Sequence, residues 1–157
     1  MPVDNLAISR SIVKLRATVP ENAFTAGILG SERVGNGIVI NSDGLILTIG
    51  YLITEATDVW LTVNDGREVA GHALAYDQVS GFGLVLPLLN PEVAPLEFGS
   101  SAKVRIADHA QVVSCPDFGT HYRCTLSGGV SSRVLGSICS TMRYSRRPRI
   151  LIGPVRH

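Results

Sequence analysis

The side chains best suited to act as metal ligands lie late in the chain. Three cysteines, Cys115, Cys124 and Cys139, occur together with His109 and His121. Thiolate and imidazole groups are preferred zinc ligands, but zinc sites use closely spaced pairs of them. These cysteines are separated by eight and by fourteen residues. The spacing therefore predicts no metal site, and no motif supports a cysteine nucleophile assisted by either histidine.

A serine followed by two glycines, Ser127-Gly128-Gly129, is the other candidate nucleophile. A serine hydroxyl becomes reactive when a base removes its proton and a third group orients that base. Ser-Gly-Gly is also common loop sequence. We therefore keep Ser127 as a weak candidate nucleophile, with an ordinary loop as the alternative.

The elements that would position such groups are predicted to be strands. Short apolar runs alternate with turn residues, and the tetrapeptides 41–44 and 64–67 are typical hairpin turns. Repeated hairpins at regular spacing predict a small antiparallel barrel or sandwich. The expected strands are 8–19, 35–40, 45–48, 58–63, 68–76 and 82–87, with one short helical turn over 52–57.

Eight apolar strand residues are expected to contribute to the core, although alternation can place some of them on the outer face. They are Ile38, Ile40, Leu45, Leu47, Trp60, Val63, Leu84 and Leu86. His72 is expected to be a packed or half-exposed strand residue. Prolines 87, 91 and 95 then mark a connector. Two further strands are predicted over 103–105 and 110–114.

Three segments, in order, resemble the N-terminal barrel of trypsin-like serine proteases, specifically the HtrA/Deg group. Residues 35–48, GNGIVINSDGLILT, are similar to that group's G-S-G-x-I-I-x-x-D-G-x-I-L-T. Residues 59–68 are similar to its V-x-L-x-D-G-R-E, and residues 77–86 to its D-x-x-T-D-L-A-L-L-K. The resemblance covers about residues 8–114. It implies an all-β fold, a trypsin-like N-terminal β-barrel with an incomplete second barrel.

Two catalytic positions of that family hold other residues here. Hydrolysis needs a serine nucleophile, a histidine base and an aspartate that orients the histidine. By the resemblance, the histidine position falls on Tyr51 and the aspartate position on Gly81. A tyrosine, with an ordinary pKa near ~10, is a poor base at neutral pH, and glycine has no side chain. The serine motif G-N-S-G-G does not occur either, and Ser127 lies in the nearest similar text.

The last forty residues differ in character from the rest. Residues 118–157 contain seven arginines and no lysine, aspartate or glutamate, whereas residues 1–117 contain all 13 acidic residues. Residues 144–157 can be encoded so that reading one nucleotide earlier gives text similar to the family's nucleophile loop. A genuine divergent tail and an out-of-frame translation both explain this composition. The expected division is a barrel over 8–95, the start of a second barrel over 96–114, and a divergent basic tail over 115–157.

The sequence thus predicts a trypsin-like serine protease homologue that is catalytically inactive and binds a peptide or protein. The alternatives are an active serine-type endopeptidase with an unusual nucleophile and a non-functional truncated product. A net charge of +1 does not favour nucleic-acid binding, and no apolar run is long enough to span a membrane as a helix. No cofactor is expected. The first residues lack signal-peptide features, so a cytoplasmic location with reduced thiols is expected. Self-association is expected from uncovered strand edges.

Overall fold

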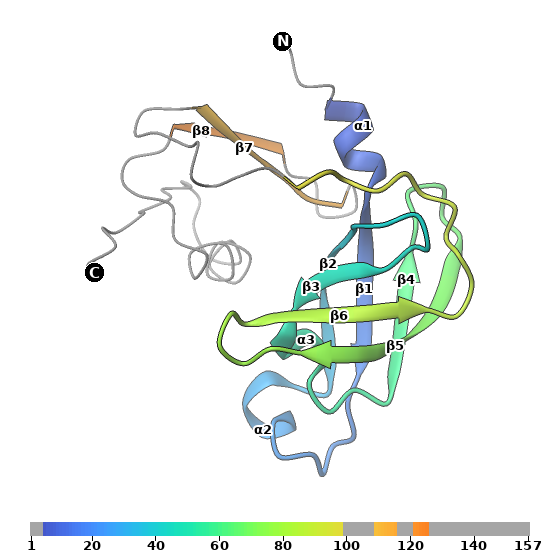
Figure 1. Cartoon of the computed structure of the whole chain (residues 1–157). Coiled ribbons are helices and arrows are strands. Elements are labelled where there is room, and N and C mark those ends of the chain that lie inside the picture. Colours follow the sequence, from blue (N-terminus) through green and yellow to red (C-terminus); the bar gives the residue numbers. More distant parts are fainter. Residues whose placement is uncertain (1–4, 99–108, 116–120, 126–157) are drawn as a thin grey trace. The chain divides into compact units, whose positions relative to one another are not determined.

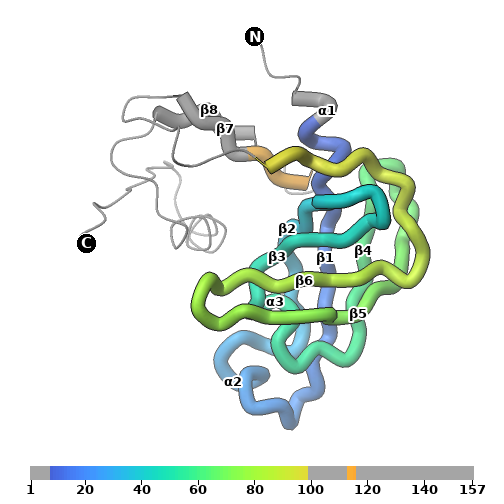
Figure 2. The backbone as a smooth tube through the Cα atoms, viewed as in Figure 1, coloured from blue at the N-terminus to red at the C-terminus, as the bar shows by residue number. Residues whose placement is uncertain are grey.

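The computed structural model describes residues 5–98, 109–115 and 121–125 (Figures 1 and 2). The chain divides into two units, the first containing residues 1–97 and 114–120 and the second residues 98–113 and 121–157. The elements of the first unit are α1 (Asn5–Arg10), β1 (Ile12–Thr18), α2 (Ala26–Leu29), β2 (Glu32–Val39), β3 (Ile46–Ile49), α3 (Gly50–Ile53), β4 (Asp58–Thr62), β5 (Glu68–Tyr76) and β6 (Phe82–Pro87). Each unit is described separately.

Six antiparallel strands of the first unit close into a barrel in the order β1-β2-β3-β6-β5-β4. β1 joins the two ends of this order, because Leu15 lies opposite Gly35 of β2 on one side and Leu61 of β4 on the other. Closure gives most strand backbones a partner on both edges. The predicted fold class, all-β with a trypsin-like barrel, is confirmed.

Alternate residues of the strands point into the barrel and fill its interior. The buried residues of this cluster include Val13, Leu15, Ala17, Val39, Ile46, Val59, Leu61 and Val85. Burying aliphatic side chains of this size contributes about 1.5–3 kcal/mol each, which makes this cluster the main stabilising element.

Most of the predicted core set lies on the other face of the strands. Of the eight residues, Val63 is buried and Trp60 is 39% exposed, while the remaining six are half-buried. The triplets Ile38-Val39-Ile40 and Leu84-Val85-Leu86 are apolar on both faces, so the sequence does not reveal which parity points inward. His72, expected to be packed or half-exposed, is exposed on β5.

The two predicted hairpin turns form through carboxylate and amide caps. The Asn41 Oδ1 accepts hydrogen bonds from the Asp43 and Leu45 amides, at 3.1 and 2.8 Å. At the second turn the Arg67 amide donates to Asp65 Oδ1 at 2.9 Å, and Gly66 has a φ of 88°. A left-handed φ favours glycine, which explains why the turn signal was readable from the sequence.

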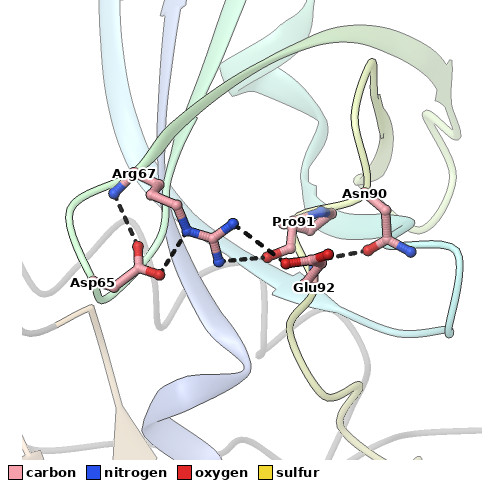
Figure 3. A network of polar contacts seen from close by, with 5 residues as sticks. All are labelled: Asp65, Arg67, Asn90, Pro91 and Glu92. Carbon is pink, nitrogen blue, oxygen red and sulfur yellow. Dashed lines mark hydrogen bonds and ion pairs between the residues drawn. The ribbon is translucent and has the colours of Figure 1, made fainter.

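A polar network attaches the segment after β6 to the β4–β5 turn of the barrel (Figure 3). Arg67 donates from Nε to Asp65 at 2.7 Å and from Nη2 to the Pro91 carbonyl at 3.1 Å, and it lies 3.7 Å from Glu92. The Glu92 amide donates to Asn90 Oδ1 at 2.8 Å. The hydrogen bond from the Arg67 amide holds the pKa of Asp65 below its ordinary value. The network fixes the connector that the prolines predicted.

Three short helices modify the predicted element list. The expected helical turn over 52–57 occurs as α3, which begins at Gly50 and ends at Ile53. The expected first strand is shorter than predicted, because residues 5–10 form α1. The four-residue α2 was not predicted. Its sequence, AGIL, is too short for a helical period to be read.

In the second unit, β7 (His109–Val113) pairs with β8 (His121–Thr125) as an antiparallel two-stranded sheet. β7 corresponds to the strand predicted over 110–114, whereas β8 was not predicted. The strand expected over 103–105 lies outside the described residues. None of the helices in the described part of the chain is long and apolar enough to cross a membrane.

Candidate functional site

Tyr51 and Gly81, the two positions to which the resemblance pointed, lie on neighbouring segments. Tyr51 is half-buried in α3, directly after β3, and Gly81 directly precedes β6. The Gly50 amide donates to the Gly81 carbonyl at 2.8 Å, and β3 pairs with β6 next to this contact. The backbone therefore brings these two positions close together, with a phenol at one and no side chain at the other.

Gly81 ends a tight turn that Asp77 organises. The Asp77 carboxylate accepts hydrogen bonds from the Val79 and Ser80 amides, at 3.1 and 3.0 Å. The Ser80 hydroxyl and these amides hold the pKa of Asp77 below its ordinary value. Asp77 is thus engaged in its own turn.

Gly81 has room for a side chain but a backbone conformation that favours glycine. Its φ is 78°, and a β-carbon added there would meet no atom within 4 Å. An aspartate would therefore fit sterically. Its backbone would be left-handed, which strains every residue relative to glycine, although Asp and Asn tolerate this conformation better than other L-residues.

Glycine is needed where α3 packs against the hairpin of β5 and β6. A β-carbon at Gly50 would lie 2.0 Å from ring carbons of Tyr76. A β-carbon at Gly83 would lie 2.7 Å from Ile53 Cδ1 and 3.1 Å from the Gly50 Cα. The Tyr76 ring therefore covers Gly50, the residue before Tyr51.

A buried arginine fixes the end of α3. Arg33 is 2% exposed, and its Nη1 donates to the carbonyls of Tyr51 and Thr54, at 2.6 and 2.9 Å. Its Nε donates to the Gly30 carbonyl at 3.1 Å, and its Nη2 to Thr25 Oγ1 at 2.8 Å. Cationic donors suit the free carbonyls at a helix C-terminus. Arg33 therefore holds the backbone that carries Tyr51.

A glutamate extends this clamp to the loop before β2. Glu55 accepts hydrogen bonds from the Phe24 and Thr25 amides, at 3.1 and 2.8 Å, and from the Thr25 hydroxyl. The Thr25 hydroxyl, followed by the Thr25 amide, holds the pKa of Glu55 below its ordinary value. Thr25 thus bridges Glu55 and Arg33, and its contacts join residues 24–33 to residues 51–55.

Sequence reasoning missed this clamp. Arg33 lies just before the glycine-rich strand predicted over 35–40, and a charged residue at such a place is normally expected to be exposed. Glu55 has a φ of 60°, which is uncommon for a residue other than glycine. The one available signal was an arginine beside an apolar strand, and that signal alone does not distinguish a buried clamp from a solvated side chain.

Within the described part of the chain, none of the other candidate side chains is seen at this site. Ser127 and Cys139 lie outside them, and the side chains of His109, His121 and Cys124 are not described. Cys115 is 4% exposed, and its amide donates to Asn36 Oδ1 at 2.9 Å. Over the part of the chain that the structure describes, no three His, Cys, Asp or Glu residues gather as metal ligands would.

Comparison with known proteins identifies the family of the chain. A family model for the trypsin-like peptidase domain matches residues 35–151. The periplasmic pH-dependent serine endoprotease DegQ of Escherichia coli K12 is 35% identical over 103 residues, which are 64% of this chain and 22% of DegQ. The chain thus spans about a fifth of that relative's length.

Solved structures show the same fold. The HtrA-type protease AlgW with a tripeptide superposes with a TM-score of 0.55 at 19% identity, over 67% of this chain and 32% of AlgW. A variant of AlgW, also with a tripeptide, gives a TM-score of 0.56 at 18% identity, over 69% of this chain and 34% of that variant. The chain belongs to the trypsin-like peptidase family. Within that family its relatives place it in the HtrA group, as the three sequence motifs predicted.

Proposed function

We propose that this chain is a non-catalytic member of the family that binds an extended peptide or an unfolded protein segment. The observation that carries the proposal is the identity of two residues at neighbouring places of an intact barrel: Tyr51 follows Gly50, whose amide donates to the Gly81 carbonyl. A catalytic base must accept a proton near neutral pH, and its partner must orient it. A phenol beside a glycine does neither.

The binding role has separate support. The barrel core and the clamp at Arg33 are complete, so losing the triad residues has not removed the scaffold around them. The Tyr76 ring, which packs over Gly50, is 46% exposed. Partly exposed aromatic side chains are common at sites that bind peptides. AlgW, a structural neighbour, was solved with a tripeptide.

The test uses fluorescently labelled casein, an unfolded protein, with the full chain. We expect no cleavage, because removing members of a triad costs about 10⁴–10⁶ in kcat, and we expect casein to bind. Cleavage that a serine-directed phosphonate abolishes would instead establish the alternative, an active endopeptidase with an unusual nucleophile. Absence of both cleavage and binding would favour the non-functional product.

A double substitution, Tyr51→His with Gly81→Asp, tests whether the two positions alone explain inactivity. We expect no restored cleavage, because the sequence also lacks the family's nucleophile motif. The unsubstituted chain is the control, and casein binding should be retained in both. Cleavage by the double variant would show that a nucleophile such as Ser127 is in place.

A further inference from the structure

One stretch of the barrel has an open strand edge. β5 pairs with β4 from Glu68 to Gly71 and with β6 from Gly71 to Tyr76. Residues 72–76 therefore have β6 on one side and, within the described part of the chain, no strand on the other, and all five are exposed. Figure 1 shows the β5–β6 hairpin reaching away from β4. Among the described residues, no backbone hydrogen bond from a turn or loop reaches this edge.

The open edge presents backbone groups at two residues. In an antiparallel strand, alternate residues direct both N–H and C=O to the same side. The Leu88 amide donates to the Ala70 carbonyl at 2.8 Å, so Ala70 faces the β6 side and Ala73, three residues on, faces the open edge. The Asp77 amide donates to the Phe82 carbonyl at 2.9 Å, so Tyr76 also faces the open edge. A strand laid along it would gain up to four backbone hydrogen bonds.

The edge has no charged side chain to keep other strands away. Residues 72–76 are His-Ala-Leu-Ala-Tyr, with Leu74 49% exposed and Tyr76 46% exposed. Natural edges are usually protected by lysine, proline or a bulge. Here a register shift between Ala73 and Ala75 leaves Leu74 as a bulge, and the bulge is the single protective feature.

We propose that the open edge of β5 binds an extended segment of another protein by strand addition, with apolar side chains at alternate positions. This rests on the proposed peptide-binding function and specifies its surface. The bulge argues against a second copy as the occupant. Two β5 edges paired symmetrically would oppose their bulges at Leu74, whereas a regular strand needs to follow only one.

The charge at one end of the edge specifies the partner further. Continuing the register of Val59 opposite Gly71 places Asp58, an exposed residue, opposite His72. A strand antiparallel to β5 runs in the direction of β4, so its C-terminal end meets Asp58. The favoured segment therefore carries lysine or arginine at that end, after its alternating apolar residues.

The experiment uses the full chain and an acetylated, amidated hexapeptide that alternates valine and threonine and ends in lysine. We expect the peptide to slow amide exchange at Ala73 and Tyr76. The control peptide carries N-methylated threonines, which keep the side chains but cannot donate backbone hydrogen bonds. We expect it to bind about tenfold more weakly, the effect of losing about one hydrogen bond.

Matched variants test the surface in the protein. Ala73→Pro removes an outward N–H at an edge position that tolerates proline, and Leu74→Lys adds a charge. Both should weaken peptide and casein binding about tenfold. Val79→Lys, at a residue that is 83% exposed in the adjoining turn, is the control and should bind like the unsubstituted chain.

The outcomes separate this proposal from the function on which it rests. Casein binding that is equal in all variants would overturn strand addition at β5 and leave the peptide-binding function standing. If the unsubstituted chain binds neither casein nor the hexapeptide, both the strand-addition proposal and the peptide-binding function are overturned. A dimer that Leu74→Lys dissociates in the absence of peptide would show that a second copy occupies the edge, and would overturn the proposed partner.

Discussion

At the scale of single residues, the backbone that carries Tyr51 is held in place by polar side chains from other parts of the barrel. Arg33 satisfies two carbonyls at the end of α3, and Thr25 connects it to Glu55. A buried guanidinium is stabilising only while its acceptors remain in place, since desolvating a charge is costly. The segment carrying Tyr51 is therefore held by a complete polar network.

Replacing Arg33 should destabilise the barrel. Arg33→Met removes the donors and leaves the Tyr51 and Thr54 carbonyls buried without their partner, at a cost of about 2–4 kcal/mol. Arg33→Lys keeps the charge but not the planar geometry, so its cost should be similar or slightly smaller. Denaturant unfolding measures both. Arg16→Met, at an exposed strand arginine that lies 3.8 Å from Glu68, is the comparison, and equal effects of Arg33→Met and Arg16→Met would contradict the clamp.

Glu55 should make part of the stability pH-dependent. Its pKa is lowered in the folded chain by the Thr25 hydroxyl and amide, so its contribution is complete above the unfolded pKa. The contribution is lost as pH falls through the lower, folded pKa. The unfolding midpoint of the unsubstituted chain should therefore fall more steeply than that of Glu55→Gln between about pH 6 and pH 3. Parallel curves for the two proteins would show that the carboxylate contributes nothing.

At the scale of elements, close packing of α3 on the β5–β6 hairpin explains two glycines. Gly50→Ala should cost about 1–3 kcal/mol, because the new methyl group would displace the Tyr76 ring. In a Tyr76→Ala background the same substitution should be nearly neutral. A double-mutant cycle from denaturant unfolding measures the difference. Equal costs in both backgrounds would place the strain somewhere other than the Tyr76 ring.

The strands themselves were largely predictable, because their turns carry strong local signals. The β5 and β6 bounds, 68–76 and 82–87, match the prediction, and the turn at Gly66, directly before β5, carries such a signal. The inward face was not predictable, because Ile38, Val39 and Ile40 are all apolar. The clamp at Arg33 and the open edge of β5 depend on tertiary pairing, which periodicity does not encode. The adjacency of positions 51 and 81 came from the family resemblance.

The slowest amides should lie in the strands that share the core. We expect slow hydrogen exchange around Ile38–Ile40 and Leu61–Val63, because β1 pairs with both β2 and β4 beside the buried cluster. Exchange measured residue by residue tests this, with the exposed turn at Asn64–Arg67 as the fast reference. Uniformly fast exchange in both strands would mean that the barrel does not form in solution.

At the scale of the whole molecule, two hypotheses remain for the basic tail. The match to the trypsin-like family extends to residue 151, well into the arginine-rich residues 118–157. A divergent but genuine tail would complete a second subdomain, whereas an out-of-frame tail would lack the apolar pattern that a packed sheet needs. These hypotheses differ in how readily trypsin reaches the tail arginines.

Limited trypsin digestion of the full chain distinguishes them. If the tail is out of frame, the arginines from 133 onward should be cut early, because a sequence not selected for packing leaves them accessible. Arg123 lies within β8, so cleavage there should be slower. Arg33 is the internal control, since it is buried and should resist longest. A monomer whose tail resists trypsin as long as Arg33 does would establish a second subdomain, and sequencing codons 114–157 would then confirm the reading frame.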